Sequence, residues 1–288
     1  MRTLRNLLTA ALVTLSLGAC ALPASQPPAA AAPRTVEIPP EMLRMAEMAL
    51  EDGLPNEARQ RFTRLMGMDA QNPHVRLGLA ESMLALDEVG PARERFDELQ
   101  AIEPVRARAL QGKGLALMRM NRRDEAVKVL SAAVEADPDL WRAWNALGGL
   151  HDFAHQFDLA AEAYGRALAL RPGSGVIRNN MGYSLLLQGK PAEAARLLMD
   201  ALQREPRLEA AHANLRLALA MQGRYNDARA GLTRDRQAAA LNNIGFVALS
   251  RGDYAEAETF LAQAVEASPH YHERAAANLL RVRALNGG

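Results

Sequence analysis

The chain has 288 residues and an almost balanced charge, with 34 Lys and Arg against 33 Asp and Glu and a net charge of +1. Nucleic acids and anionic lipid surfaces attract strongly basic proteins, so this balance argues against either as a partner. Aromatic residues make up only 5% of the chain and alanine is abundant, which favours helix throughout.

The first segment is a short basic region, residues 1–5, followed by an apolar run from Leu7 to Leu17. A helix of that length rises only roughly 16 Å, about half of a hydrocarbon core of ~30 Å, so it is too short to span a bilayer. Its length and flanks are those of a secretory signal. We predict a signal peptide over residues 1–19.

The apolar run ends in Leu17-Gly18-Ala19-Cys20, which resembles the lipobox of bacterial lipoproteins. Cys20 is the only cysteine, so no disulfide can form within the chain. A lone cysteine can also be a small buried hydrophobe, but its place after a signal favours lipidation of Cys20. Several acyl chains, at about 0.8 kcal/mol per buried CH₂, hold a protein on a membrane. Ala21 follows the cysteine, and the resemblance to Gram-negative sorting then implies an outer-membrane lipoprotein facing the periplasm.

Residues 20–38 are rich in Pro and Ala and show no apolar period. Such a segment resists packing and behaves as an extended, semi-rigid spacer. We predict a disordered tether that, at ~3.1 Å per residue, reaches up to roughly 60 Å.

From residue 39 onward the sequence repeats with a period of 34 residues. The predicted blocks are 39–72, 73–106, 107–140, 141–174, 175–208, 209–237 and 238–271. Position 20 is alanine in every block: Ala58, Ala92, Ala126, Ala160, Ala194, Ala228 and Ala257. Position 8 is small in six blocks, position 24 is large in all seven, and position 32 is proline in five. We predict that proline at position 32 ends a helix in the blocks that carry it.

This pattern resembles the tetratricopeptide repeat (TPR), and the block 141–174 matches its signature best. The matching residues are Trp144, Leu147, Gly148, Ala160, Tyr164, Ala167 and Pro172. The resemblance implies an all-α, right-handed TPR superhelix, an α-solenoid in which each repeat contacts its neighbours and which has a concave and a convex face. We expect residues 272–288 to form a C-terminal capping helix.

The sixth block, 209–237, is five residues shorter than the others. Its expected second helix lacks the alanine at position 27 and the proline at position 32, and contains the charged stretch Thr233–Gln237 instead. Two interpretations remain open: a tolerated deletion, or a hinge or lip of a binding site.

Catalytic and metal-binding patterns are weak. His151 and His155 have ligand spacing on a helix, but His151 takes a position normally filled by a packed aromatic residue, and His155 falls in the expected turn. The His270-Tyr271-His272 stretch at the start of the capping helix is typical of a surface. No nucleophile elbow and no phosphate-binding loop after a strand occurs. We therefore predict no enzyme activity, metal site, cofactor or small-molecule substrate.

The resemblance implies that the first helix of each repeat lines the concave face. Positions 5 and 6 of these helices carry Asn145, Asn179, Asn180, Asn214, Asn242 and Asn243. Positions 9 to 13 carry large apolar residues, among them Phe153, Tyr183, Leu217 and Phe246. Asparagine both donates and accepts, so we predict that these residues bind the backbone of an extended peptide or an amphipathic helix. The alternative is that asparagine is generic at these positions and the apolar residues pack under the next helix.

The whole chain is similar to the TadD family of tight-adherence (Flp) pilus assembly lipoproteins. The lipobox, the tether, the short late repeat and the Asn-Asn-hydrophobic-Gly sequences at Asn179 and Asn242 carry this resemblance. It implies a scaffold for pilus assembly that binds the secretin or other assembly components, in the manner of a pilotin. The alternatives are a type IV pilus pilotin (PilF/PilW-like), an adaptor for peptidoglycan hydrolases (NlpI-like) and, from another class, a lipoprotein enzyme.

Overall fold

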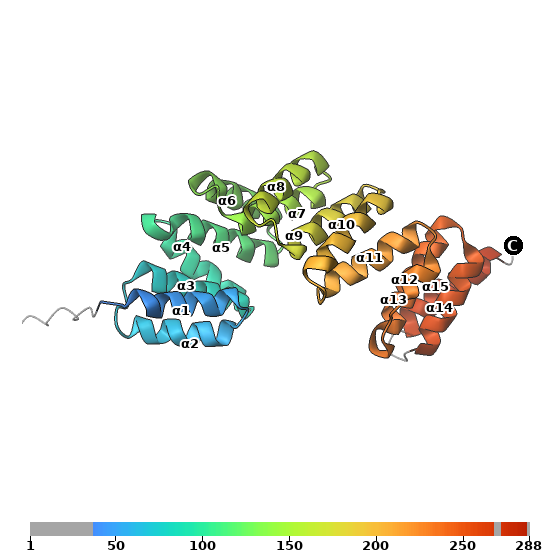
Figure 1. The fold of residues 1–288 in the computed structure, drawn as a ribbon, viewed down its shortest axis with the longest axis horizontal. Coiled ribbons are helices and arrows are strands. Elements are labelled where there is room, and N and C mark those ends of the chain that lie inside the picture. Colours follow the sequence, from blue (N-terminus) through green and yellow to red (C-terminus); the bar gives the residue numbers. More distant parts are fainter. Residues whose placement is uncertain (1–36, 268–271, 287–288) are drawn as a thin grey trace, which may run out of the picture. The chain divides into compact units, whose positions relative to one another are not determined.

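A computed structural model describes residues 37–267 and 272–286. The predicted signal peptide, the lipidation residue Cys20 and residues 20–36 of the predicted tether lie outside the described residues. In the part that is described, every regular element is a helix (Figure 1). The prediction of an all-α repeat fold is confirmed.

Most helices pack against their neighbours in the chain. In order, they are α1 (Pro40–Glu51), α2 (Pro55–Met66), α3 (Pro73–Ala85), α4 (Val89–Leu99), the 3-10 turn η1 (Glu103–Val105), α5 (Arg106–Arg119), α6 (Arg123–Ala136), α7 (Trp141–Phe153), α8 (Phe157–Leu170), α9 (Gly175–Leu187), α10 (Pro191–Arg204), α11 (Glu209–Met221), α12 (Tyr225–Arg229), α13 (Arg234–Arg251), α14 (Tyr254–Ala267) and α15 (His272–Asn286). The buried residues form a row of small clusters, each shared by consecutive repeats. Such an array is stabilised by contacts between neighbours and has no single central core.

Small residues are needed where the two helices of a repeat cross. All seven position-20 alanines have no exposed surface. At position 8, a methyl group on Gly148 would lie 2.5 Å from the Tyr164 ring, and one on Gly182 would lie 2.8 Å from Leu198 Cγ. The large residue at position 24 therefore lies directly over position 8 of its own repeat.

In the first two repeats the residue at position 24 packs against the following repeat. The Phe62 ring at position 24 reaches the next repeat, where a methyl group on Gly78 would lie 2.1 Å from its Cζ atom. Phe96 makes the same approach to Gly112, at 2.3 Å. The glycine needed for a close approach thus moves to position 6 of the following repeat, and alanine is tolerated at position 8.

The turn between the two helices of each repeat has one recurring feature. The residue at position 15 has a positive φ in all seven repeats: Gly53, Asp87, Asn121, His155, Gly189, Gly223 and Gly252. Glycine, asparagine and aspartate adopt this left-handed conformation most readily, since they have no side chain or a short polar one. His155, with φ 55°, belongs to this turn.

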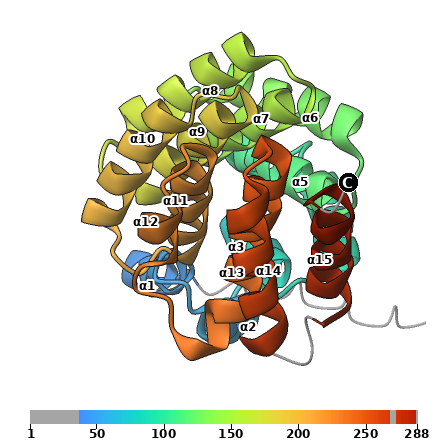
Figure 2. The ribbon, with the colours of Figure 1, turned by 90° about the vertical axis from the view of Figure 1, so that its right-hand side faces the viewer.

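The sixth block differs from the prediction. Its second helix, α12, has only five residues and ends at Arg229 (Figure 2). Gly231 then has a φ of +67°, which interrupts the helix, and α13 begins at Arg234 rather than at the predicted boundary of 238. The charged stretch 234–237 therefore extends the first helix of the next repeat. Five missing residues leave too little chain for a full second helix.

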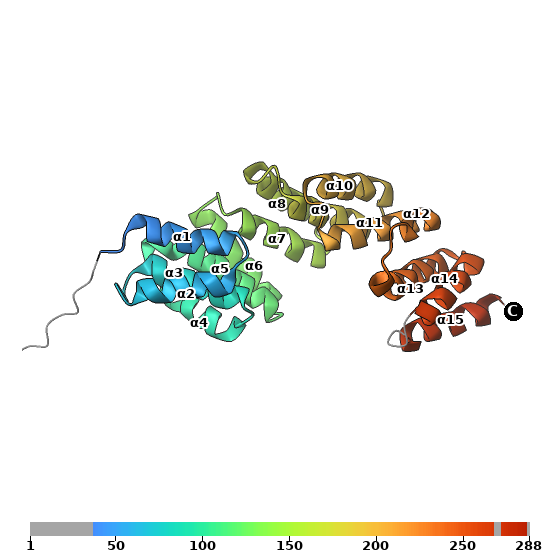
Figure 3. The ribbon, with the colours of Figure 1, turned by 60° about the horizontal axis from the view of Figure 1, so that its bottom comes forward.

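The last described helix, α15, packs against α14 (Figure 3). Its Ala275 and Val282 have no exposed surface. Among the described helices, none combines the length and the apolar character needed to cross a membrane.

Candidate functional site

The predicted asparagines hydrogen-bond to one another across repeats. Asn214 Nδ2 donates to Asn179 Oδ1 (2.9 Å), Asn179 Nδ2 to Asn180 Oδ1 (3.1 Å), and Asn180 Nδ2 to Asn145 Oδ1 (3.0 Å). We call these four residues the asparagine ladder. Asn179 is buried, at 6% exposure, and bonds to both Asn214 and Asn180. Asn145 and Asn180 keep part of their hydrogen-bonding capacity, because each primary amide can make more bonds than the ladder uses.

A second, shorter chain of amides lies near the end of the array. Asn278 Nδ2 donates to Asn242 Oδ1 (3.2 Å), and Asn242 Nδ2 approaches Asn243 Oδ1 (3.5 Å). Asn278 was not among the predicted residues, because it lies on α15 rather than on the first helix of a complete repeat.

Four of the predicted residues line one pocket of about 760 Å³, which we call the α7–α9 pocket: Asn145, Phe153, Asn180 and Tyr183. Its wall is mostly apolar, since Leu115, Met118, Val176 and Leu187 also contribute. Phe153 is 61% exposed and Tyr183 44% exposed, and the Arg123 guanidinium stacks on the Phe153 ring at 3.7 Å. These aromatic side chains do not pack under the next helix.

Four others line a separate cleft of about 690 Å³ between α11 and α13, which we call the α11–α13 cleft: Asn214, Leu217, Asn243 and Phe246. Asn179 and Asn242 line neither space. Eight of the ten predicted residues therefore divide between two separate spaces.

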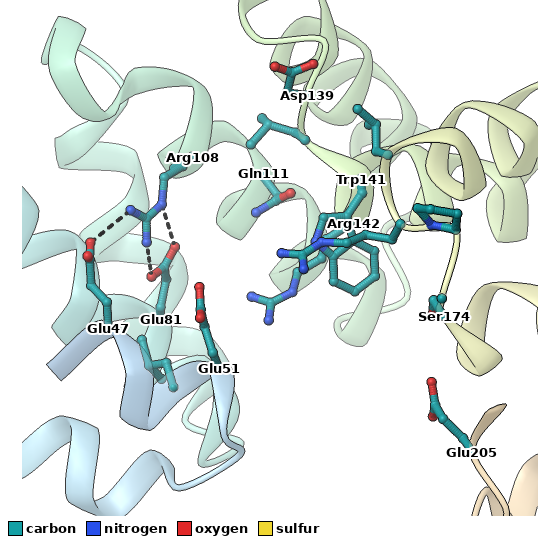
Figure 4. Close-up of a pocket in the computed structure, with 16 residues that line it drawn as sticks. Glu47, Glu51, Glu81, Arg108, Gln111, Asp139, Trp141, Arg142, Ser174 and Glu205 are labelled. Carbon is teal, nitrogen blue, oxygen red and sulfur yellow. Dashed lines mark hydrogen bonds and ion pairs between the residues drawn. The ribbon is translucent and has the colours of Figure 1, made fainter. Parts of the chain in front are cut away.

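A third space of about 800 Å³, the charged pocket, is lined by residues of the first five repeats (Figure 4). Arg108 donates to both oxygens of Glu81 (2.8 and 3.3 Å) and to Glu47 (3.3 Å). Burial raises the pKa of Glu81 although Arg108 acts in the opposite direction. Two carboxylates thus share one guanidinium on this wall.

The opposite wall of the charged pocket is cationic and aromatic. The guanidinium carbons of Arg142 and Arg171 lie 5.3 and 5.6 Å from the centre of the Trp141 ring, within the range of a cation–π contact. Figure 4 shows the Arg142 side chain extending into the pocket. Among the described residues, neither arginine has an ion-pair partner.

Sequence reasoning missed the charged pocket, although a signal was present. Glu47 and Glu81 stand at position 9, Arg108 and Arg142 at position 2, and Glu51 at position 13. Positions 9 and 13 belong to the stretch of the first helix expected to face inward, and position 2 lies on the same helix. In the early repeats they carry charges instead of the apolar residues found later.

One buried carboxylate joins the fourth and fifth repeats. Asp152, 4% exposed, accepts hydrogen bonds from the Tyr164 hydroxyl (2.9 Å) and from Ser184 Oγ (2.6 Å). Burial, and then the Asp152 charge, raise the pKa of Tyr164. His151 lies nearby but its Nδ1 contacts Gln156 Oε1 at 2.8 Å. No cluster of three or more metal-ligating side chains occurs in residues 37–267 and 272–286.

Comparison with known proteins places these features in a family. Tetratricopeptide repeat profiles match residues 49–114, 112–175, 150–209 and 237–268. A TPR repeat-containing protein of Pseudomonas aeruginosa is 32% identical over 177 residues, covering 60% of this chain and 30% of that protein. This chain therefore spans less than a third of that relative.

Two solved structures have a similar fold. The structure of the APC/C hetero-tetramer Cut9-Hcn1 gives a TM-score of 0.68 at 19% identity, covering 84% of this chain and 48% of that chain. A thermophilic TPR protein of Thermus thermophilus gives 0.53 at 23% identity, covering 65% and 97%. At such identities the likeness shows the fold alone. The matched profiles establish that this chain belongs to the tetratricopeptide repeat superfamily. The paired helices and the similar structures show that it folds as an all-α TPR superhelix.

Proposed function

We propose that this protein is a scaffold that holds a segment of a partner protein in the α7–α9 pocket. Protein–protein interaction is the general role of TPR folds. The observation that carries the proposal for this pocket is the exposure of large apolar side chains around it: Phe153 at 61%, Tyr183 at 44% and Leu187 at 43%.

The pocket combines two kinds of contact that a peptide needs. Aromatic side chains on a pocket wall lose water on binding and supply anchor contacts, which dominate the affinity of such surfaces. Asn145 and Asn180 line the same pocket and can still bond to a peptide backbone. An extended segment or one face of an amphipathic helix fits both requirements.

At a finer level, we propose an outer-membrane lipoprotein that serves pilus assembly, with the secretin or another assembly component as its partner. The lipobox before Cys20, the Pro/Ala-rich tether and the Asn-Asn-hydrophobic-Gly sequences support this role by their similarity to TadD-like proteins.

The binding test uses labelled peptides that tile the periplasmic part of the secretin and the pilus subunit of the same organism. Phe153→Ala with Tyr183→Ala should weaken the best-binding peptide at least about tenfold in fluorescence anisotropy. The matched control is Leu159→Ala with Met199→Ala, which removes apolar side chains of similar exposure from α8 and α10. Equal loss in both variants, or unchanged binding in a folded test variant, would exclude the pocket. If only peptides from cell-wall hydrolases bind, the role in pilus assembly is excluded, whereas the proposal of a protein-binding scaffold stands.

The asparagines are less suitable targets than the aromatic residues. Removing Asn214 or Asn180 takes a hydrogen-bond partner from the buried Asn179. A fall in affinity could then reflect lost stability, because an unsatisfied buried amide costs about 1–3 kcal/mol.

The membrane anchor has its own test. Cys20→Ser should abolish incorporation of labelled palmitate and move the protein from the membrane fraction to the soluble fraction, because the chain has no other cysteine. Membrane fractionation that stays as in the wild type would contradict the lipid anchor at Cys20.

A further inference from the structure

We propose that the α11–α13 cleft is a second partner site, formed by the shortened sixth repeat, and that it binds a protein segment carrying an acidic side chain beside an apolar one. Arg216 would receive the carboxylate. This site is separate from the α7–α9 pocket and does not depend on the partner proposed there.

Arg216 occupies position 8, where every other repeat has alanine or glycine. In the seventh repeat a methyl group on Gly245 at position 8 would lie 2.7 Å from Leu261 Cγ at position 24. In the sixth repeat the position-24 residue, Leu232, follows the end of α12 and lies outside any helix. No residue of α12 therefore stands at position 24 to lie over Arg216, and Leu232 packs against the neighbouring core from outside the helix.

A cleft lies beside Arg216. Its lining is largely apolar, with Leu217 and Ala220 from α11 and Ile244, Phe246 and Val247 from α13. Ala220 and Ile244 are buried, whereas Phe246 is 47% exposed. A partner side chain can thus enter between a buried apolar surface and an exposed aromatic ring.

The charge of Arg216 is unsatisfied. Its side chain is half-buried, and the loss of water lowers its pKa. Within residues 37–267 and 272–286 it makes neither a hydrogen bond nor an ion pair. Arg178, which is buried at 8% exposure, pairs with Asp200 (2.5 Å) and with the Ser174 carbonyl (3.0 Å). A partly desolvated guanidinium is stabilised by a carboxylate, which it can bind through two parallel hydrogen bonds.

The residues that line the α11–α13 cleft favour an acidic protein segment over a nucleic acid as the ligand. A nucleic acid would bring many charges to a cleft whose surface is largely apolar. A segment with one Asp or Glu next to Leu or Phe satisfies both the cation and the apolar walls. Asn214 and Asn243 also line the cleft and can bond to the backbone of such a segment.

The test uses a synthetic array of 12-residue peptides in which Asp or Glu is flanked by Leu or Phe, with matched Asn/Gln and Lys versions. The wild-type protein should bind the acidic peptides at least about tenfold more tightly than their amide versions. Arg216→Met should lose this preference, and Arg216→Glu should prefer the Lys versions. Arg207→Met, which removes an exposed arginine outside the cleft, should keep the wild-type preference.

A second variant separates binding from folding. Ala240→Trp places a bulky side chain in the cleft and leaves Arg216 unchanged, so it should block the acidic peptides while the thermal unfolding curve stays cooperative. The proposal is overturned if wild type shows no acidic preference, or if folded Arg216→Met or Ala240→Trp keeps it. A concentration-dependent dimer that Ala240→Trp abolishes would identify a second copy as the occupant, and would also overturn the proposal.

Discussion

At the scale of single residues, Asp152 couples two repeats through buried hydrogen bonds. Asp152→Ala removes the acceptor of both Tyr164 and Ser184. Buried donors without a partner cost about 1–3 kcal/mol, so we expect a loss of unfolding free energy in that range. Chemical denaturation measures it, and Glu94→Ala, an exposed acidic residue on α4, is the control and should stay within about 0.5 kcal/mol of wild type. Equal stability of the Asp152 and Glu94 variants would mean that water replaces the lost carboxylate.

Residue identity also explains which site residues could be predicted. The exposed aromatics Phe153 and Tyr183 follow from their inward positions, because the first helices of consecutive repeats present the same positions to the pockets. The mutual bonding of Asn179, Asn180 and Asn214 does not follow, since it depends on side-chain rotamers and on the spacing between repeats. The sequence predicts that asparagines recur at positions 5 and 6. It does not predict how many of their hydrogen-bond donors and acceptors remain free for a ligand.

At the scale of elements, the close contact between positions 8 and 24 makes a sharp prediction about two glycines. Gly182→Ala should destabilise the protein, because the new methyl group would lie 2.8 Å from Leu198 Cγ. Gly165→Ala, within α8 and with no atom within 4 Å of the new methyl group, should stabilise it by about 0.5–1 kcal/mol. Thermal unfolding of both variants shows whether each substitution lowers or raises the stability. A stabilising Gly182→Ala would show that Leu198 moves aside without cost.

The 34-residue period predicted the paired helices of the regular repeats, but it did not predict that α12 is so short. A repeat alignment assigns residues to positions and assumes that each position keeps its structure. The deletion in the sixth block breaks that assumption, because Gly231 interrupts the helix and residues from Arg234 join α13. The same limitation hid the site proposed at Arg216, where no residue of α12 occupies position 24. Patterns of residue type predict regular repeats well and irregular ones poorly.

At the scale of the whole molecule, stability comes from contacts between neighbours, and this can be tested by removing one repeat. Deleting Trp141–Ser174 removes α7 and α8 and joins Leu140 to Gly175, so every later helix keeps its place in the 34-residue period. The surface of α6 that packs on α7 would then meet α9, which carries Ile177 and Gly182 at positions equivalent to Ala143 and Gly148. We expect a folded protein that unfolds at a lower temperature, partly because Ser184 loses its bond to Asp152.

The matched control for this deletion removes only residues 141–156, which contain α7 and the following turn. This places two second helices, α6 and α8, in succession and leaves the buried face of α8 around Ala160 and Tyr164 without its partner helix. Circular dichroism should show that the full-repeat deletion loses only the helix of α7 and α8 and still melts cooperatively. The half-repeat deletion should lose more helix than it removes and melt broadly. Loss of nearly all helix in the full-repeat deletion would contradict the nearest-neighbour account, because the flanking repeats would then have failed to rejoin.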